Sequence, residues 1–191
     1  MELSSTKVTI TDKILAATIL PFVPHSVTPN QVTILRLILT PFVVALLVLE
    51  YYAIGFVLFA CTALTDAIDG AMARTRNQIT NWGKIADPVA DKLLIGSVAM
   101  VLVLRYLGIG ITFALLGMEI FIIISAILWR RRGQEIQANI WGKIKMVLQV
   151  IGVLVLLLAI ILQLPALFSV AFWIFTLALV FAGISIFAYG I

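Results

Sequence analysis

Four aspartates lie in two short stretches of this chain, Asp66-Ala67-Ile68-Asp69-Gly70-Ala71-Met72-Ala73-Arg74 and, after eight residues, Gly83-Lys84-Ile85-Ala86-Asp87-Pro88-Val89-Ala90-Asp91. Each stretch adjoins an apolar run long enough to cross a bilayer. Ionisable groups at membrane depth are costly, and they are therefore usually retained for function. The two stretches thus mark the ends of two predicted membrane helices and also the candidate functional site.

The composition is that of an integral membrane protein. Of the 191 residues, 63% are hydrophobic, and the mean hydropathy is +1.18, whereas a soluble domain is about 45–50% apolar. The apolar residues form continuous runs, as in membrane helices, and do not alternate as barrel strands do. Cys61 is the single cysteine, which excludes an internal disulfide and a zinc motif built on several cysteines. The sequence predicts an all-α, polytopic membrane bundle.

Six membrane-spanning helices with short connections are predicted, which favours antiparallel neighbours. The predicted spans are residues 31–49, 53–73, 85–105, 109–129, 144–163 and 167–188. Before them, residues 9–22 form a segment of mixed polarity that is too short to cross a bilayer, and we predict an amphipathic helix lying at the interface. The chain is expected to be one domain over 1–191, with the interfacial helix and linker in 1–30 and the six-helix bundle in 31–191.

The basic residues predict the orientation in the membrane. All lysines and arginines except Arg105 fall on one side of this topology, and the positive-inside rule places that side, with both termini and the aspartates, in the cytoplasm. The net charge of +4 is then a consequence of topology and of contact with anionic headgroups, and no nucleic-acid partner is expected. The chain's size and the absence of a targeting signal favour the bacterial inner membrane.

The spacing of the aspartates predicts that they face one another. Asp66 and Asp69 are three residues apart on the end of one helix, and Asp87 and Asp91 are four apart on the start of the next, so each pair shares a face. Clustered carboxylates repel one another unless cations neutralise them. No histidine or cysteine is nearby, and an all-oxygen ligand set suits Mg²⁺ or Mn²⁺. Four carboxylates can hold two such ions about 3.5–4 Å apart, an arrangement used for phosphoryl chemistry.

The residues between the aspartates suit a phosphate ligand. Gly70 and Gly83 leave room for a ligand or a backbone to approach, and Ala73 adds a third small residue. Arg74 offers a rigid fork of donors that matches two phosphate oxygens. The alternative is that the aspartates are structural ion pairs, or the cation path of a transporter. A transporter would be expected to place carboxylates on several broken helices near mid-membrane, whereas here they lie on two consecutive helix ends.

The two stretches together read D-x2-D-G-x2-A-R-x8-G-x3-D-x3-D, which resembles the signature of the CDP-alcohol phosphotransferase (CDP-alcohol phosphatidyltransferase) family. The stretch Pro29-Asn30-Gln31-Val32-Thr33-Ile34-Leu35-Arg36 resembles the start of the family's first helix. The resemblance implies six spans and a divalent-metal enzyme that moves a phosphatidyl or similar group from a CDP-linked donor to an alcohol, with release of CMP. It also implies a homodimer in contact with membrane lipids.

The resemblance also implies a role for each matching residue. Asp66, Asp69, Asp87 and Asp91 would hold two Mg²⁺ or Mn²⁺ ions, and Asp91 would also be the base that takes the proton of the acceptor hydroxyl. The positions expected to contact the CDP part of the donor are Asn30, Thr33, Gly70, Ala73, Arg74 and Gly83.

Softer similarities indicate the acceptor. The stretches Asp87-Pro88-Val89-Ala90-Asp91-Lys92 and Trp141-Gly142-Lys143-Ile144-Lys145 resemble the phosphatidylglycerophosphate synthases, the branch of the family that uses CDP-diacylglycerol and glycerol 3-phosphate. Such synthases usually carry an arginine where this chain has Met118. Phosphatidylglycerol, as in a cardiolipin synthase, and inositol phosphate, as in a phosphatidylinositol-phosphate synthase, stay open as acceptors. The candidate acceptor-binding residues are Arg36, Glu119, Arg130, Lys143 and Lys145.

Overall fold

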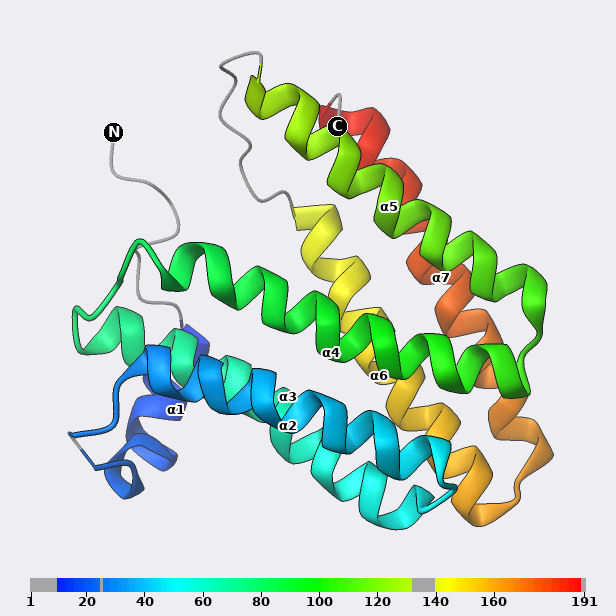
Figure 1. Cartoon of the computed structure of the whole chain (residues 1–191), viewed down its shortest axis with the longest axis horizontal. Coiled ribbons are helices and arrows are strands. Elements are labelled where there is room, and N and C mark those ends of the chain that lie inside the picture. The colour runs from blue at the N-terminus through cyan, green and yellow to red at the C-terminus, as the bar shows by residue number, and fades with distance from the viewer. Residues whose placement is uncertain (1–9, 25, 132–139, 190–191) are drawn as a thin grey trace. The chain divides into compact units, whose positions relative to one another are not determined.

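This computed structural model describes residues 10–24, 26–131 and 140–189, and every regular element in them is a helix (Figure 1). Its elements are α1 (Ile10–Thr18), the 3₁₀ turn η2 (Leu20–Phe22), α2 (Pro29–Val48), α3 (Tyr52–Thr75), α4 (Gly83–Tyr106), α5 (Ile109–Arg131), α6 (Ile140–Leu162) and α7 (Pro165–Tyr189). The chain divides into two compact units, Met1–Leu94 and Ile95–Ile191, with the boundary inside α4. The all-α prediction is confirmed for the described residues.

The six long helices coincide with the six predicted spans to within a few residues, but only some are apolar enough to qualify by composition. Four helical stretches are long and apolar enough to cross a membrane: α2, α3, α6 and residues Pro165–Ile186 of α7. α4 differs because its first ten residues include Lys84, Asp87, Asp91 and Lys92. In α5 the apolar stretch counted among the described residues, Ile109–Ser125, is shorter than a span. The protein is an integral membrane protein, and the count of six spans stays a prediction.

The start of α2 is fixed by its own sequence. Thr28 and Gln31 form a capping box, in which each side chain bonds the other residue's backbone N–H, and Pro29 occupies the first turn, where a missing N–H is tolerated. The buried positions of α2 recur every three or four residues, as a helix with one buried face requires. They are Pro29, Thr33, Arg36, Thr40, Val43 and Leu47. Of its polar members, Thr33 and Arg36 lie in the first half of the helix and belong to the candidate site.

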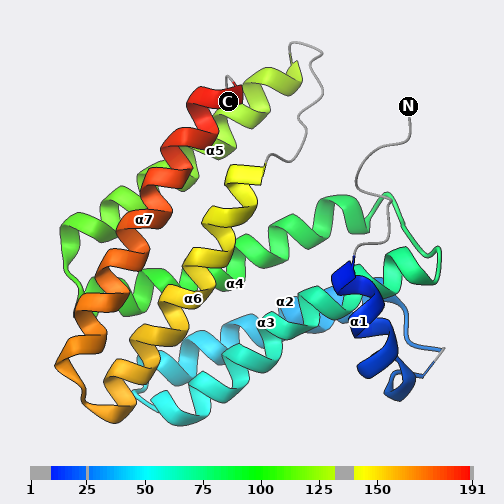
Figure 2. The same cartoon turned by 180° about the vertical axis from the view of Figure 1, so that it is seen from behind.

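Helices α2 and α3 run side by side in both views (Figures 1 and 2) and are joined by a tight connection at Glu50, whose φ is 67°. Gly55 of α3 allows the two helices to approach closely. A Cβ at Gly55 would lie 2.5 Å from Leu47 Cδ2, which is closer than real contacts allow. The antiparallel pair therefore brings the first half of α2 beside the last half of α3, where Asp66 and Asp69 lie.

The N-terminal segment packs against the end of α3. Leu20 of η2 is buried with Ala71 and Met72 of α3. Arg76, just after α3, donates hydrogen bonds to the backbone carbonyl oxygens of Val23 at 2.9 Å and of two further linker residues, Pro24 and Val27, at 3.4 Å. Helix α1 and the turn η2 lie within the predicted segment 9–22, and the amphipathic character of this segment and its place at the membrane interface stay predictions.

In the second unit, α6 and α7 form a closely packed pair (Figure 2). A Cβ at Gly152 of α6 would lie 3.0 Å from the Phe175 ring of α7, so the absence of a side chain at Gly152 permits this contact. Trp141 and Phe181 stack with ring centroids 5.7 Å apart. These contacts fix the register between the two helices.

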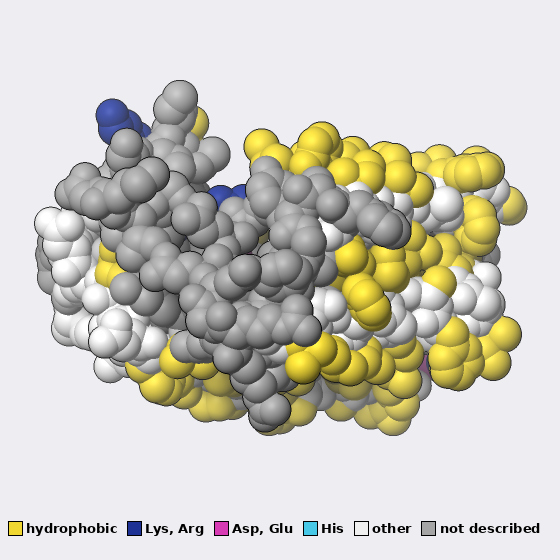
Figure 3. Space-filling model, turned by 90° about the horizontal axis from the view of Figure 1, so that it is seen from above, with side chains coloured by type: hydrophobic (Ala, Val, Ile, Leu, Met, Phe, Trp, Pro, Cys, Tyr) yellow, Lys and Arg dark blue, Asp and Glu magenta, His cyan; other side chains and the backbone are white. Residues whose placement is uncertain are grey.

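Hydrophobic side chains cover much of the surface that Figure 3 shows outside the grey residues. Many large ones are exposed on the long helices, among them Phe42 at 59%, Phe113 at 64% and Trp173 at 67%. Such extensive apolar exposure is unfavourable in water but suits a lipid environment, since lipid tails are as apolar as these side chains.

Candidate active site

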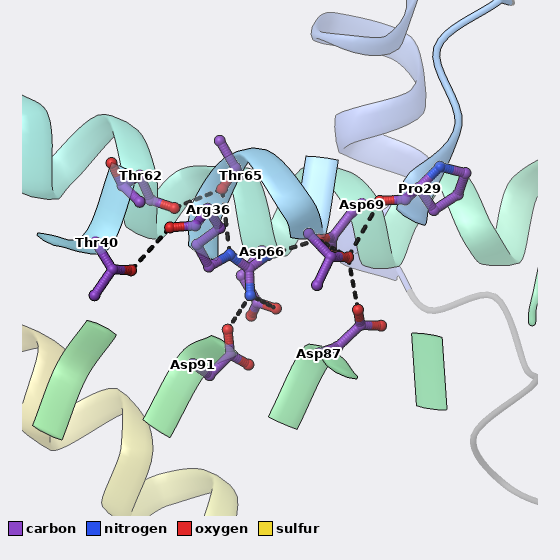
Figure 4. Close-up of polar contacts among 10 residues, drawn as sticks. Pro29, Arg36, Thr40, Thr62, Thr65, Asp66, Asp69, Asp87 and Asp91 are labelled. Carbon is purple, nitrogen blue, oxygen red and sulfur yellow. Dashed lines mark hydrogen bonds and ion pairs between the residues drawn. The ribbon is translucent and has the colours of Figure 1, made fainter. Parts of the chain in front are cut away.

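Arg36 lies at the centre of the aspartate cluster (Figure 4). Its side chain is fully buried, and its NH1 donates to Asp66 Oδ1 at 3.0 Å and also bonds Asp91, while NH2 donates to Asp69 Oδ2 at 2.6 Å. The remaining donor, Nε, points to the Thr65 hydroxyl at 3.4 Å. One guanidinium from α2 thus joins two aspartates of α3 to one of α4.

The fourth aspartate is held by a neighbour of Arg36. Asp87 Oδ1 lies 2.7 Å from the hydroxyl of Thr33, one turn before Arg36 on the same face of α2, and that hydroxyl also lies 3.3 Å from Asp69 Oδ2. Thr33 is 1% exposed, whereas Asp87 is partly buried. The predicted convergence of Asp66, Asp69, Asp87 and Asp91 is therefore present in the structure, organised by two side chains of α2.

Asn30 in the first turn of α2 lies beside Gly83 at the start of α4. The Thr80 hydroxyl donates to Asn30 Oδ1 at 2.8 Å and accepts a hydrogen bond from the Gly83 backbone N–H at 2.9 Å. A Cβ at Gly83 would lie 3.1 Å from Thr80 Oγ1, 3.3 Å from Asn30 Oδ1 and 3.5 Å from Asp87 Oδ2. Glycine at this position thus leaves room beside Asp87 and lets α4 begin against α2.

Arg74 and Gly70 lie on the last turns of α3. Arg74 Nε and NH2 donate to the two carboxylate oxygens of Asp12 in α1, both at 2.7 Å. The guanidinium covers Gly70, where a Cβ would lie 3.0 Å from Arg74 NH2. Ala73 precedes Arg74 and is half-buried. The sequence did not point to Asp12, because its partner is 62 residues away.

The chemistry of the cluster fits divalent cations. A single guanidinium among four carboxylates leaves excess negative charge, and the oxygen donors suit hard ions such as Mg²⁺ and Mn²⁺. In the described part of the chain, however, no three acidic, histidine or cysteine side chains form a ready ion cage, and the Arg36 guanidinium lies between the aspartates of α3 and Asp91 of α4. The oxygen donors that divalent ions prefer are present, and an ion held by them would have the Arg36 guanidinium as a neighbour.

Two of the candidate acceptor residues meet in the second unit. Lys145 of α6 forms an ion pair with Glu119 of α5, and Gln149 Nε2 donates to Glu119 Oε1 at 3.1 Å. Glu119 Oε2 is buried and has no hydrogen-bond partner among the described residues. Glu119 and Gln149 also line a small cavity between α4, α5 and α6, whose other walls are apolar apart from Thr112.

Arg36 is described above, and the acceptor candidates that remain are Lys143 and Arg130. Lys143 is exposed on α6, one turn before Val147. Arg130 lies in α5, and its side chain is outside the described part of the structure. Three residues not singled out from the sequence contact the predicted ones, namely Asp12, Thr65 and Thr80.

The chain is similar in sequence to a known protein family and to named members of it. Residues 26–184 match the CDP-alcohol phosphatidyltransferase family. The chain is 30% identical over 146 residues to the CDP-diacylglycerol--glycerol-3-phosphate 3-phosphatidyltransferase of Bacillus subtilis (strain 168), covering 68% of this chain and 76% of that protein. Proteins of the same name from Aquifex aeolicus (strain VF5) and Pseudomonas fluorescens are 37% identical over 122 residues and 42% identical over 83 residues.

The matched regions differ in extent. The chain spans 66% of the length of the Aquifex aeolicus protein and 42% of the Pseudomonas fluorescens protein, and these matches cover 60% and 42% of this chain. The family match, over residues 26–184, is the longest of these. It includes the whole aspartate cluster and both residues of the Glu119–Lys145 pair. On this match and on the similarity to the Bacillus subtilis protein, the chain belongs to the CDP-alcohol phosphatidyltransferase family.

Proposed function

We propose that this protein is a membrane phosphatidyltransferase that moves a phosphatidyl group from CDP-diacylglycerol to glycerol 3-phosphate, with release of CMP. The observation that carries the proposal is the convergence of Asp66, Asp69 and Asp91 on one buried guanidinium, with Asp87 held beside them by Thr33. The family match and the names of the relatives support the donor and the acceptor.

The four aspartates are the proposed ligands of two Mg²⁺ or Mn²⁺ ions. When bound, such ions supply positive charge that stabilises the donor diphosphate and the departing CMP. Arg74 is the proposed protein donor to the same diphosphate, since its fork can bond two phosphate oxygens. Asn30, Thr33, Gly70, Ala73 and Gly83 are the proposed contacts to the rest of the CDP group.

Asp91 is the proposed general base. Its carboxylate takes the proton of the acceptor hydroxyl, and the hydroxyl oxygen then attacks the phosphorus that carries the diacylglycerol. A phosphorus–oxygen bond forms to the acceptor, the bond from that phosphorus to CMP breaks, and CMP leaves with the electron pair. The reaction requires a proton acceptor within reach of the reacting hydroxyl. Asp91, the second aspartate of the α4 pair, is proposed for this role.

Glycerol 3-phosphate is favoured over phosphatidylglycerol and inositol phosphate because the relatives named above carry it in their names. Its phosphate needs a cation, and Met118 stands where the phosphatidylglycerophosphate synthases usually have an arginine. Lys145, which is paired with Glu119, is one candidate to supply that charge. Lys143, Arg130 and Arg36 are the further candidates.

The membrane arrangement is also proposed. We expect α2 to α7 to form six spans of one domain, with α1 at the interface and the aspartates at the cytoplasmic face of a bacterial inner membrane. The exposed apolar faces of the second unit, which include Phe113 and Trp173, offer candidate surfaces for a homodimer. The two acyl chains of the donor would remain in the bilayer while its diphosphate reaches headgroup height.

The decisive experiment is an assay of CMP release by the purified protein in detergent. The protein is supplied with CDP-diacylglycerol, Mg²⁺ or Mn²⁺, and one acceptor at a time: glycerol 3-phosphate, phosphatidylglycerol, inositol phosphate or serine. Release with glycerol 3-phosphate alone supports the proposal. Release with another acceptor retains the chemistry and overturns the substrate. No release with any acceptor, together with retained metal binding, would favour a cation-coupled transporter.

A further inference from the structure

We propose that Asp12 is a positioning residue for Arg74, and that through it the N-terminal helix α1 takes part in binding the donor diphosphate. The proposal rests on the proposed function, because it assumes that Arg74 bonds the diphosphate. Asp12 is 1% exposed, and its two carboxylate oxygens accept from Arg74 Nε and NH2 at 2.7 Å each. This bidentate geometry fixes the plane of the guanidinium as well as its position.

The geometry leaves Arg74 able to bond a further anion. A guanidinium has five N–H donors, and Asp12 uses the edge formed by Nε and NH2. NH1 has no hydrogen-bond partner in the part of the chain that the structure describes. NH1 lies over Gly70, 3.5 Å from where a Cβ would be. The unused donors therefore lie above a glycine of the CDP-binding pattern, where no side chain intervenes.

Docking of the N-terminal segment does not depend on Asp12 alone. Leu20 packs with Ala71 and Met72 in the core of the first unit, and Arg76 bonds three backbone carbonyl oxygens of the linker between residues 23 and 27. An aspartate buried in α1 is costly unless it is paired. Asp12 pairs with Arg74, the arginine of the family pattern, whereas Arg76 holds the linker. The choice of Arg74 as the partner of Asp12 points to a role in the site.

A long flexible side chain such as Arg74 loses rotamer freedom when it binds a phosphate. Asp12 restricts that freedom in advance, so the diphosphate meets an oriented donor. Removing the Asp12 charge while keeping its size should therefore weaken donor binding more than it slows the chemical step. We expect Asp12→Asn to raise the KM for CDP-diacylglycerol about tenfold and to change kcat by less than about threefold.

The test compares full-length Asp12→Asn, Asp12→Glu and Arg76→Gln with the unaltered protein in detergent. The KM and kcat for CDP-diacylglycerol are measured, and binding of CDP, a soluble diphosphate probe, is measured by calorimetry. Arg76→Gln is the matched control, since it removes contacts to the same segment without touching Arg74. The proposal predicts weaker CDP binding and higher KM in Asp12→Asn, partial recovery in Asp12→Glu, and no change of KM in Arg76→Gln. In an Arg74→Gln background, Asp12→Asn should have no further effect.

Two results would overturn the proposal. Equal KM values for Asp12→Asn and Arg76→Gln, with parallel losses of thermal stability, would mean that Asp12 only docks α1. Tighter CDP binding by Asp12→Asn would mean that Asp12 competes with the diphosphate for Arg74. The proposed function fails separately, when the unaltered protein releases no CMP from CDP-diacylglycerol with any acceptor. If Asp12→Asn does not fold, the KM and the CDP affinity of Asp12→Glu decide between these outcomes. Asp12→Glu retains the charge and shifts the carboxylate by one methylene.

Discussion

The Arg36 guanidinium donates to Asp69 Oδ2 at 2.6 Å, and neither side chain is more than 2% exposed. The same guanidinium bonds Asp66 and Asp91, so a protein cation lies where the aspartates of two helices meet. Any divalent ion that binds these carboxylates must share or displace the contacts of Arg36. Arg36 is therefore as important to the architecture of the site as the aspartates are.

Replacing Arg36 should destabilise the protein in a manner that metal can reverse. Arg36→Met leaves Asp69 and Asp91 buried without their partner, and breaking a buried ion pair costs about 3–5 kcal/mol. Mn²⁺ supplies replacement charge, so it should raise the unfolding temperature of Arg36→Met more than that of the unaltered protein. Thermal unfolding in detergent, with and without Mn²⁺, checks this. Arg105→Gln, at an exposed arginine, should stay within about 0.5 kcal/mol, and an equal response to Mn²⁺ in all three proteins would contradict the prediction.

Asp91→Asn should abolish most of the transfer while leaving the protein folded. A general base contributes about 10²–10⁴-fold to rate, so kcat for CMP release should fall by about that factor. The amide keeps the size of the carboxylate but cannot take the proton. Glu50→Gln, at an exposed acid in the α2–α3 connection, is the control and should retain normal activity. A loss of less than about tenfold in Asp91→Asn would remove Asp91 from the role of base.

Much of this site could be predicted from the sequence because it is local. Asp66 with Asp69, and Asp87 with Asp91, are one helical turn apart, so helix geometry alone places each pair on one face. The six long helices follow from runs of apolar residues in the same way. The aspartate pairs come together across α3 and α4 through a connection of only seven residues, Arg76–Trp82.

The contacts between distant segments could not be read from spacing. The sequence predicts Arg36 as a candidate acceptor-binding residue but does not reveal its ion pairs with three aspartates, because the neighbours of α2 are set by tertiary packing. Asp12 is 62 residues from Arg74, and a mixed-polarity segment gives no sign that its one acidic side chain is buried against a distant arginine. The Gly152–Phe175 contact likewise depends on how α6 and α7 pack, since glycine has no side chain to mark the partner.

Chelation should stop the reaction, and only hard divalent ions should restore it. Four carboxylates without a nitrogen or sulfur ligand suit Mg²⁺ and Mn²⁺. CMP release should fall to background in excess EDTA and return on addition of Mg²⁺ or Mn²⁺. Asp69→Asn should need a higher Mn²⁺ concentration for half-maximal activity, since one ligand charge is lost. Full activity in the presence of chelator would contradict a metal-dependent mechanism.

Gly83→Ala should impair activity through its effect on the start of α4. The new Cβ would lie 3.1 Å from Thr80 Oγ1 and 3.3 Å from Asn30 Oδ1, and overpacking of this kind costs about 1–3 kcal/mol. The contact would displace Asp87 as well, so the KM for the donor should rise and kcat should fall. Gly110→Ala is the matched control, because no atom of the described residues, beyond its own chain neighbours and helix backbone, lies within 4 Å of a Cβ there. Comparable activity in the two variants would show that Gly83 is dispensable.

The Glu119–Lys145 pair permits a test that separates stability from acceptor binding. Lys145→Met leaves the Glu119 carboxylate, one oxygen of which is already unpaired, without its cation, and this should cost about 3–5 kcal/mol. Adding Glu119→Gln removes the unpaired charge, so the double variant should recover much of the lost stability. If Lys145 also binds the acceptor phosphate, the stable double variant will still show a KM for glycerol 3-phosphate raised by about tenfold or more, with the KM for CDP-diacylglycerol unchanged. Recovery of both stability and acceptor KM would instead confine the pair to a structural role, and Lys143 would then be the next cation to test.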